Sequence, residues 1–245
     1  MISNAGNRYH LSSGGFGEGG FLKGTLVNSG AILVGSLIGL SAGRRLPERM
    51  KKILMQALGL AVVIIGLQMA LAGREIIAVI GCLLLGAITG ELIDVEKQVE
   101  RIGEWLKARF RSESSTFVEG FVTTSLLYLT GAMFIVGSIQ DGTTGDAGTL
   151  YIKALLDGVA SMAFASALGI GVAFSALSVL VVQGSITLLA SQLLFLQDPR
   201  VLNAVTATGG ILILAIGINI LELKKIPVGN LLPALVYAVL WAMIF

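Results

Sequence analysis

The sequence has very little cysteine, histidine and charge, and each shortage removes a class of function. Cys82 is the only cysteine among 245 residues, which excludes an intrachain disulfide, a cysteine-rich metal site and a redox pair of thiols. His10 is the only histidine, which argues against haem ligation, HExxH chemistry and serine–histidine catalysis. Charged residues make up 13% of the chain, against about 25% in an average soluble domain. The composition therefore excludes a disordered chain and a nucleic-acid-binding protein, and no cofactor is expected.

Apolar residues and glycine fill the chain instead, since 55% of the residues are hydrophobic and 32 are glycine. Seven stretches without any charge cover 158 residues, and five of them are 20 or 21 residues long while another has 40. A helix of about 20 apolar residues crosses the hydrocarbon core of a bilayer. The sequence therefore predicts an all-α, polytopic membrane protein whose partner is the lipid bilayer.

About eight transmembrane helices are expected within a single domain, 24–245. The 40-residue stretch is too long for one span, and Gly169-Ile170-Gly171 is the expected break. Residues 95–112 carry apolar side chains at helical spacing, which predicts an amphipathic cytoplasmic helix on the membrane surface with Trp105 at the interface. Residues 1–23 lack the pattern of a signal peptide and are expected to form a flexible extension. The expected spans are 24–43, 53–72, 76–93, 116–139, 150–168, 172–194, 201–221 and 227–245.

The basic residues indicate the orientation. If the N-terminus is outside, the inner loops hold 12 of the 17 lysines and arginines. The alternation of basic and non-basic loops is unbroken only with eight spans, and both termini are then outside.

An internal repeat relates the first three spans to the last three. Residues 59–71 align without gaps with 210–222, and this alignment superimposes two glycines and places Gln68 on Asn219. Three further matches have offsets of nearly the same size, so 24–94 and 171–245 are the expected units. The spans in 116–169 link them and invert the second unit relative to the first. Inverted repeats are typical of many secondary transporters and occur in some channels.

Several short sequences together resemble the YdfK/YqgA-like bacterial inner-membrane proteins, a family defined by a domain of unknown function. They are Gly24-Thr-Leu-Val-Asn28, Leu46-Pro-Glu-Arg, Gln56-Ala-Leu-Gly-Leu, Gly137-Ser-Ile-Gln-Asp-Gly142, Leu156-Asp-Gly158, Leu168-Gly-Ile-Gly171, Gln183-Gly-Ser185 and Lys225-Ile-Pro-Val-Gly-Asn-Leu-Leu-Pro-Ala234. The resemblance covers 21–245. It implies a multi-pass protein of the bacterial inner membrane and supplies no substrate.

Ionisable residues are costly in lipid and are therefore candidates for function. Asp157 lies seven residues into an expected span, and Lys153 lies four residues earlier on the same helix face. The pair is either a structural ion pair or a site for a substrate or coupling ion. Asp141 is expected in an outer loop, while Glu91 and Glu119 are expected near the inner ends of their spans.

Amide side chains inside the spans form a second set of candidates. Gln68 and Asn219 are expected to face each other across the axis of the repeat. Asn230 precedes Pro233, which frees a backbone carbonyl nearby. Each amide could equally serve only to hold helices together. The full candidate path consists of Asn28, Gln68, Lys153, Asp157, Gln183, Asn219 and Asn230.

Gly35, Gly39 and Gly43 recur every four residues, a spacing that permits close contact between helices. They are expected either between two copies in a homo-oligomer or inside one chain.

These features favour a transporter or channel for a small solute or ion over an enzyme. No GxxxxGK[ST] sequence is present, so an ion gradient is the expected source of energy. A scaffold or subunit that transports nothing is the alternative, and it would need no polar cavity. An intramembrane enzyme would need two aspartates within reach of each other, for which Asp157 and Asp141 are the candidates.

Overall fold

The computed structural model describes residues 22–244, and every regular element in that range is a helix. The expected extension lies outside the described residues, except for its last two residues. His10 also lies outside them. The helices are α1 (Lys23–Gly43), α2 (Glu48–Leu71), α3 (Ile76–Ile93), α4 (Val95–Arg109), α5 (Phe117–Tyr128), α6 (Ala132–Thr144), α7 (Gly148–Leu168), α8 (Gly171–Leu188), η1 (Leu194–Gln197), α9 (Pro199–Ile220), η2 (Val228–Leu231) and α10 (Pro233–Ile244).

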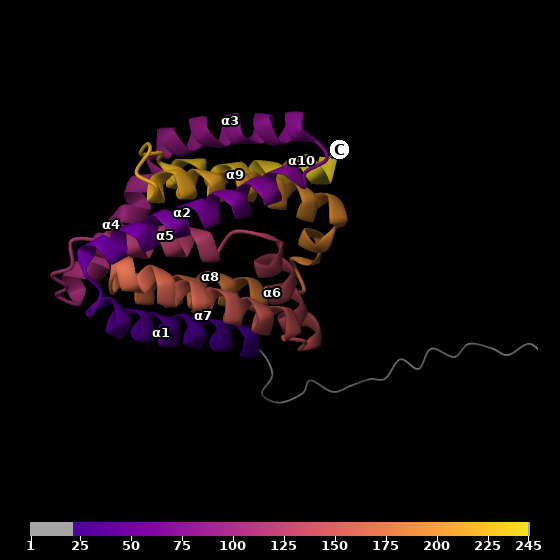
Figure 1. Ribbon diagram of the computed structural model, residues 1–245. Helices are drawn as coiled ribbons and strands as arrows, with labels where there is room; N and C mark the ends of the chain where they lie inside the picture. The colour runs from indigo at the N-terminus through magenta and orange to yellow at the C-terminus, as the bar shows by residue number, and fades with distance from the viewer. Residues whose placement is uncertain (1–21, 245) are drawn as a thin grey trace, which may run out of the picture.

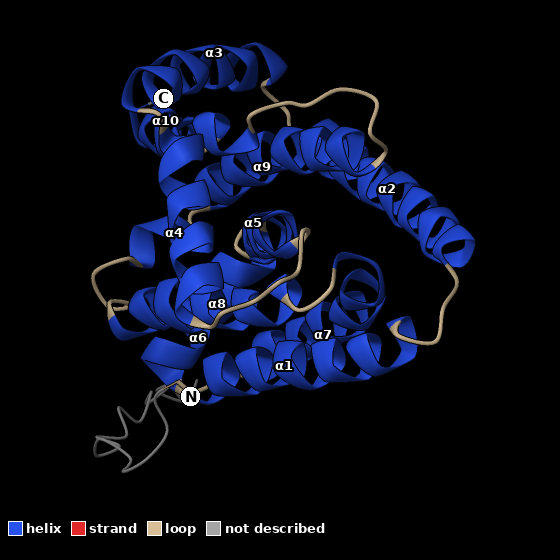
Figure 2. Ribbon diagram, turned by 90° about the vertical axis from the view of Figure 1, so that its left-hand side faces the viewer, coloured by secondary structure: helices blue, strands red, loops and turns tan. Residues whose placement is uncertain are grey.

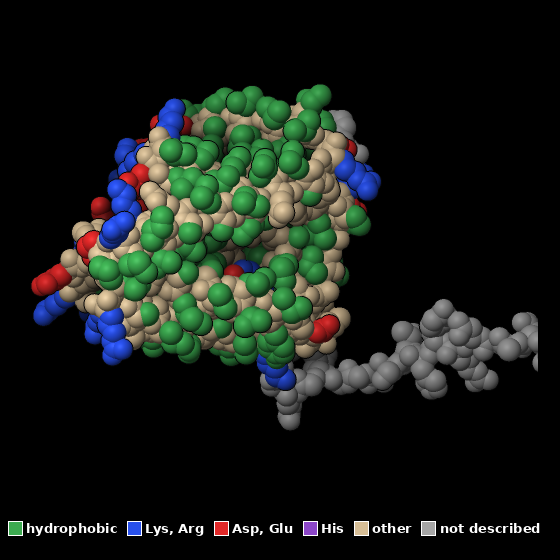
Figure 3. Space-filling model, in the orientation of Figure 1, with side chains coloured by type: hydrophobic (Ala, Val, Ile, Leu, Met, Phe, Trp, Pro, Cys, Tyr) green, Lys and Arg blue, Asp and Glu red, His purple; other side chains and the backbone are tan. Residues whose placement is uncertain are grey.

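Most of these helices lie along one common direction (Figure 1). Helices that cross a membrane are expected to have this arrangement. Within 22–244, six are long and apolar enough to cross a membrane, and α5 with α6 adds a seventh if this bent pair is one span. Val228–Ile244 forms a shorter apolar segment, so the count of eight stays a prediction. Charged side chains gather at the two ends, with an apolar belt between them (Figure 3). The end that carries α4 is called the α4 end, and the opposite one, where the chain finishes, the α10 end.

Glycines bring α1 and α7 into direct backbone contact. A Cβ on Gly35, Gly39 or Gly43 would collide with the carbonyl oxygen of Gly158, Met162 or Ser166, respectively. The two helices are therefore parallel and in register, and they lie side by side in Figure 2. The sequence left open whether these glycines lie between two copies or between helices of one chain. In the structure they lie between two helices of one chain.

Antiparallel pairs α2–α9 and α3–α10 form the other side of the bundle. Gly59 contacts Gly217, and Gly66 contacts Gly210. In the repeat, Gly59 aligns with Gly210 and Gly66 aligns with Gly217. Gly59 therefore contacts the counterpart of Gly66, and Gly66 contacts the counterpart of Gly59. This is the reciprocal pattern that a twofold axis produces. The inverted repeat of the complete units stays a prediction.

The span expected at 116–139 is wrong as a single helix. The chain breaks after α5 and bends by 68° before α6, which continues to Thr144. Gly131 has φ +112° and ψ 164°, a conformation that side chains with a Cβ rarely adopt. Residues 120–140 contain no proline or charge, so the composition around the break did not reveal it.

The break at Gly169 is confirmed, because α7 ends at Leu168 and α8 begins at Gly171. Gly169 has φ +79° and ends α7. The following span ends earlier than expected, at Leu188. The last span starts with a short 3-10 turn, and α10 begins at Pro233, which fits the first position of a helix.

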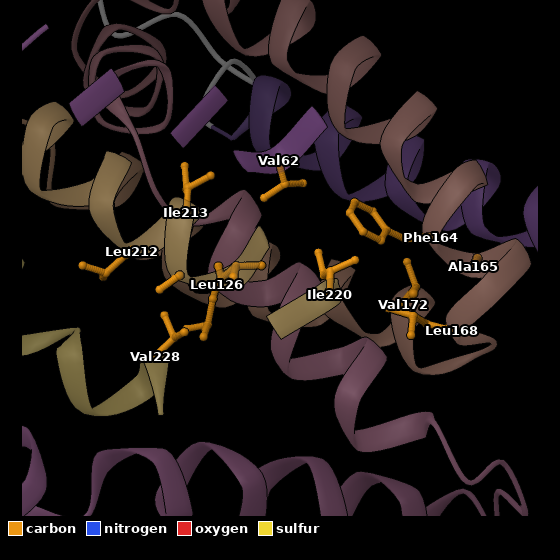
Figure 4. Packing of buried hydrophobic residues seen from close by; sticks show 12 residues of the cluster. Val62, Leu126, Phe164, Ala165, Leu168, Val172, Leu212, Ile213, Ile220 and Val228 are labelled. Atoms are coloured by element: carbon orange, nitrogen blue, oxygen red, sulfur yellow. The ribbon is translucent and has the colours of Figure 1, made fainter. Parts of the chain in front are cut away.

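The amphipathic helix is confirmed as α4, where Gly103 and Leu106 are buried and Trp105 is exposed. The main apolar core joins α2, α5, α7, α8 and α9 (Figure 4).

Candidate functional site

Lys153 and Asp157 form an ion pair inside the bundle. They are one turn apart on α7, with Lys153 Nζ 2.5 Å from Asp157 Oδ2. The side chains are only 8% and 10% exposed. Removing two charges from water costs several kcal/mol per ion unless hydrogen bonds compensate. The surrounding helices supply such bonds.

Two amides from α1 and α8 extend the ion pair into a network. Asn28 Nδ2 donates to Asp157 Oδ2 at 3.1 Å and to Gln183 Oε1 at 3.0 Å. Gln183 Nε2 donates to Thr25 Oγ1 at 3.1 Å. Asn28 and Gln183 are both fully buried. Four of the seven candidate residues therefore meet in one place, which we call the charged network.

The network has an unused acceptor. Asn28 Oδ1 is buried and has no hydrogen-bond partner among the described residues. An unsatisfied buried acceptor costs about 1–3 kcal/mol, so this oxygen is a place where a cation or a donor group could bind.

The apolar face of the bundle is hollowed between α1 and α2. An acidic and a basic side chain are visible in this hollow (Figure 3). Within α1, α2 and α7, Lys153 and Asp157 are the charged residues that lie away from the helix starts.

Tyr128 connects the network with the broken span. Lys153 Nζ lies 5.9 Å from the centre of the Tyr128 ring, within the range of a cation–π contact. The Tyr128 hydroxyl and Ser161 Oγ are 2.7 Å apart. Tyr128 is the last residue of α5, so the ion pair lies beside the place where the span breaks.

The break itself packs against α9. A Cβ on Gly209 would lie 2.6 Å from Thr130 Cγ2 and 3.9 Å from the backbone nitrogen of Gly131. Two helix ends therefore lie inside the bundle, where some of their backbone groups have no helical partner. Irregular backbone at this depth is tolerated where protein or a water-filled cavity surrounds it.

Asp141 does not lie in an outer loop, as its polar surroundings in the sequence suggested. It is fully buried in α6, and its Oδ2 accepts the backbone N–H of Gly24 at 3.1 Å. A carboxylate at the start of α1 is favourable because of the helix dipole. The buried residues Phe134, Ser138 and Asp141 have helical spacing, and this signal could have placed Asp141 on the inner face.

Gln68, Asn219 and Asn230 lie away from the network. Gln68 is exposed on α2. Asn219 forms two hydrogen bonds of 2.8 Å with the backbone of Ile226, which closes the loop after α9. The expectation that Gln68 and Asn219 face each other is therefore wrong, because antiparallel packing places them at different levels of the α2–α9 pair.

Asn230 joins the α3–α4 junction to η2. Its Nδ2 donates to Glu91 Oε2 at 2.6 Å, and its Oδ1 accepts the Glu96 backbone N–H at 2.7 Å. Glu96 Oε2 in turn accepts the N–H of Gly229 at 2.5 Å. Burial raises the pKa of Glu96 above its usual value. These contacts hold a connection at the α4 end and use both side-chain polar atoms of Asn230.

Two cavities approach α9 from opposite ends. One, of about 300 Å³, opens at the α10 end and is lined by residues that include Arg74, Cys82, Asn203 and Thr208. The other, of about 570 Å³, opens at the α4 end and reaches inward to Leu126 and Ile216. Within residues 22–244 no group of three or more histidine, cysteine or acidic side chains is arranged to hold a metal ion.

Comparisons with known proteins confirm the resemblance seen in the sequence. The family described as "Protein of unknown function (DUF554)" matches residues 23–243. "Uncharacterized protein YqgA" of Escherichia coli is 32% identical over 220 residues, covering 88% of this chain and 94% of that protein. "Uncharacterized membrane protein YdfK" of Bacillus subtilis is 33% identical over 216 residues, covering 86% and 92%. No solved structure matches the chain.

Proposed function

We propose from its geometry that this member of the DUF554 family, which is described as being of unknown function, is a transporter or channel for a small ion or solute. The charged network between α1, α7 and α8 carries this proposal. It contains an ion pair, two amides and an acceptor without a partner, all buried inside a membrane protein.

The energetics of the network favour a role in function over a role in stability. A buried ion pair adds little or nothing to stability compared with apolar residues of similar size. Ionisable residues within membrane spans accordingly mark ion pathways, proton relays and ligand sites. A protein that only holds other proteins together has no need of such a network, which is the reason for preferring transport to the scaffold alternative.

The broken span and the repeat support the same proposal. Many secondary transporters contain discontinuous helices near the middle of the membrane, at the interface of inverted repeats. Here the break lies next to Tyr128, which contacts both Lys153 and Ser161. Binding of an ion at Asp157 would weaken the hold on Lys153, and Tyr128 would transmit that change to the break.

We place the protein in the bacterial inner membrane with both ends outside. The α4 end then faces the cytoplasm, in agreement with the positive-inside rule. Arg44, Arg45, Lys51 and Lys52 lie at the connection from α1 to α2, and α4 adds further basic residues. The described start of the chain and the end of α10 lie at the same end of the bundle (Figure 1).

The proposal is tested in proteoliposomes that contain the purified protein. Electrical current and solute flux are recorded across a panel of inorganic ions, small organic acids and small amines. We expect a flux for at least one member of the panel, and we expect Asp157→Asn to abolish it. Asp146→Asn is the control, because Asp146 is exposed at the turn before α7 and lies outside the network.

Flux that is equal in Asp157→Asn and the native protein would contradict the role of the network. Silence across the whole panel, in protein that stays folded and monodisperse, would favour the scaffold alternative.

A further inference from the structure

The two cavities beside α9 share one row of that helix. Thr208 lines the cavity at the α10 end, and Ile216 lines the cavity at the α4 end. Residues four apart lie on the same side of a helix, so Thr208, Leu212 and Ile216 form a continuous row. The inner ends of the cavities are about 12 Å apart along α9, at about 1.5 Å per residue.

Leu212 is the side chain in the middle of this row. It is 1% exposed and belongs to the main apolar core. Leu212 and Ile213 leave α9 in different directions (Figure 4). Leu212 is thus the residue of this row that lies between the two cavities.

The cavities at the two ends of the row contain polar groups that an apolar core would not require. Thr208 Oγ1 is fully buried and has no hydrogen-bond partner among the described residues. The cavity at the α4 end is lined by both acidic and basic side chains, among them Glu119 and Lys225. Both cavities therefore present polar or charged groups to a solute.

The broken span lies beside the same part of α9. Gly209, next to Thr208, packs against Thr130 and Gly131 at the break. A movement at the break would change the packing of α9 next to Leu212. The charged network reaches this point through Tyr128, the last residue of α5.

Resting on the proposed function, we infer that the substrate path runs along α9, that the two cavities are its outer and inner halves, and that Leu212 closes it. The charged network controls the path through the break and does not itself conduct the substrate. The path suits a small polar solute or ion, since each cavity combines apolar walls with a few polar groups.

Access of a thiol reagent from each side of the membrane tests the path without knowledge of the substrate. The probe is a membrane-impermeant quaternary-ammonium methanethiosulfonate, applied to vesicles of known orientation. Native Cys82 lines the cavity at the α10 end and reports on the outer half. Ile216→Cys in a Cys82→Ser background reports on the inner half. We expect each reporter to react only from its own side.

Leu212→Ala should open the path. The rate at which each reporter reacts from the opposite side should rise by about tenfold or more, which corresponds to roughly 1.4 kcal/mol off the barrier. Ile213→Ala is the matched control, because it deletes an equally large side chain, 3% exposed, from the neighbouring position. Ile213→Ala should leave access from the opposite side unchanged.

The outcomes separate this inference from the proposed function. If Leu212→Ala behaves like Ile213→Ala, or if the reporters do not react from their own sides, the path does not follow α9 and the inference is overturned. A flux that depends on Asp157 would still support transport in that case. If the reporters react as expected but no solute or ion crosses even in Leu212→Ala, the proposed function fails together with the inference.

Discussion

Replacing Asp157 by asparagine separates the structural cost of a buried charge from its functional use. The substitution leaves Lys153 charged, with its side chain 8% exposed and its partner gone. Removing one member of a buried ion pair costs roughly 3–5 kcal/mol. For a chain of 245 residues, at roughly 2–4 °C per kcal/mol, the melting temperature should fall on the order of 10 °C.

Removing both charges should restore most of the stability. In Lys153→Gln with Asp157→Asn no charge remains, and the two amides can still bond with each other and with Asn28. Replacing both partners of a buried pair is often neutral or stabilising. The assay heats each variant in detergent and measures the fraction that stays monodisperse in size-exclusion chromatography.

The double variant also decides what the pair does. If the charges serve transport, this variant is stable and carries no flux in proteoliposomes. A stable double variant with native flux would make the ion pair purely structural. The reasoning about charge burial is refuted if the double variant is as unstable as Asp157→Asn alone.

Three further substitutions test packing, capping and pH dependence in the same melting assay. Gly39→Ala places a Cβ against a carbonyl oxygen of α7 and should cost roughly 1–3 kcal/mol, whereas Gly81→Ala meets no atom within 4 Å and should be nearly neutral; equal effects would contradict the α1–α7 packing. Asp141→Ala removes the acceptor for the first turn of α1 and should cost about 1–2 kcal/mol, while Asp146→Asn keeps an acceptor for the Gly148 N–H at the exposed start of α7 and should cost less than about 0.5 kcal/mol. Burial raises the pKa of Glu96 above 4.5, so folding favours its protonated form. Its contribution to stability is complete below pH 4.5 and is lost as pH rises through the raised pKa. Glu96→Gln should therefore flatten the pH profile between pH 4.5 and the raised pKa of Glu96, and an unchanged profile would contradict the assignment.

Composition and short-range spacing determined the class of this protein and part of its site. Charge-free stretches of span length predicted the helical membrane fold, since the hydrocarbon core excludes charge over a fixed thickness. The four-residue spacing of Lys153 and Asp157 predicted their ion pair, because residues one turn apart are neighbours on any helix. The glycine at 169 indicated the turn between α7 and α8. Each of these features depends on neighbours in the chain.

Contacts between distant helices were decided only by the tertiary structure. Uniformly apolar helices carry little information about which faces meet, so Asn28 and Gln183 were separate candidates until α1 and α8 packed beside α7. The same ambiguity made Gln68 and Asn219 look like partners, although antiparallel packing separates them. Asp141 looked like a loop residue because its solvation depends on the start of α1, more than one hundred positions earlier in the chain. The sequence thus determined what had to lie within the membrane, and the packing of the helices decided which polar groups met there.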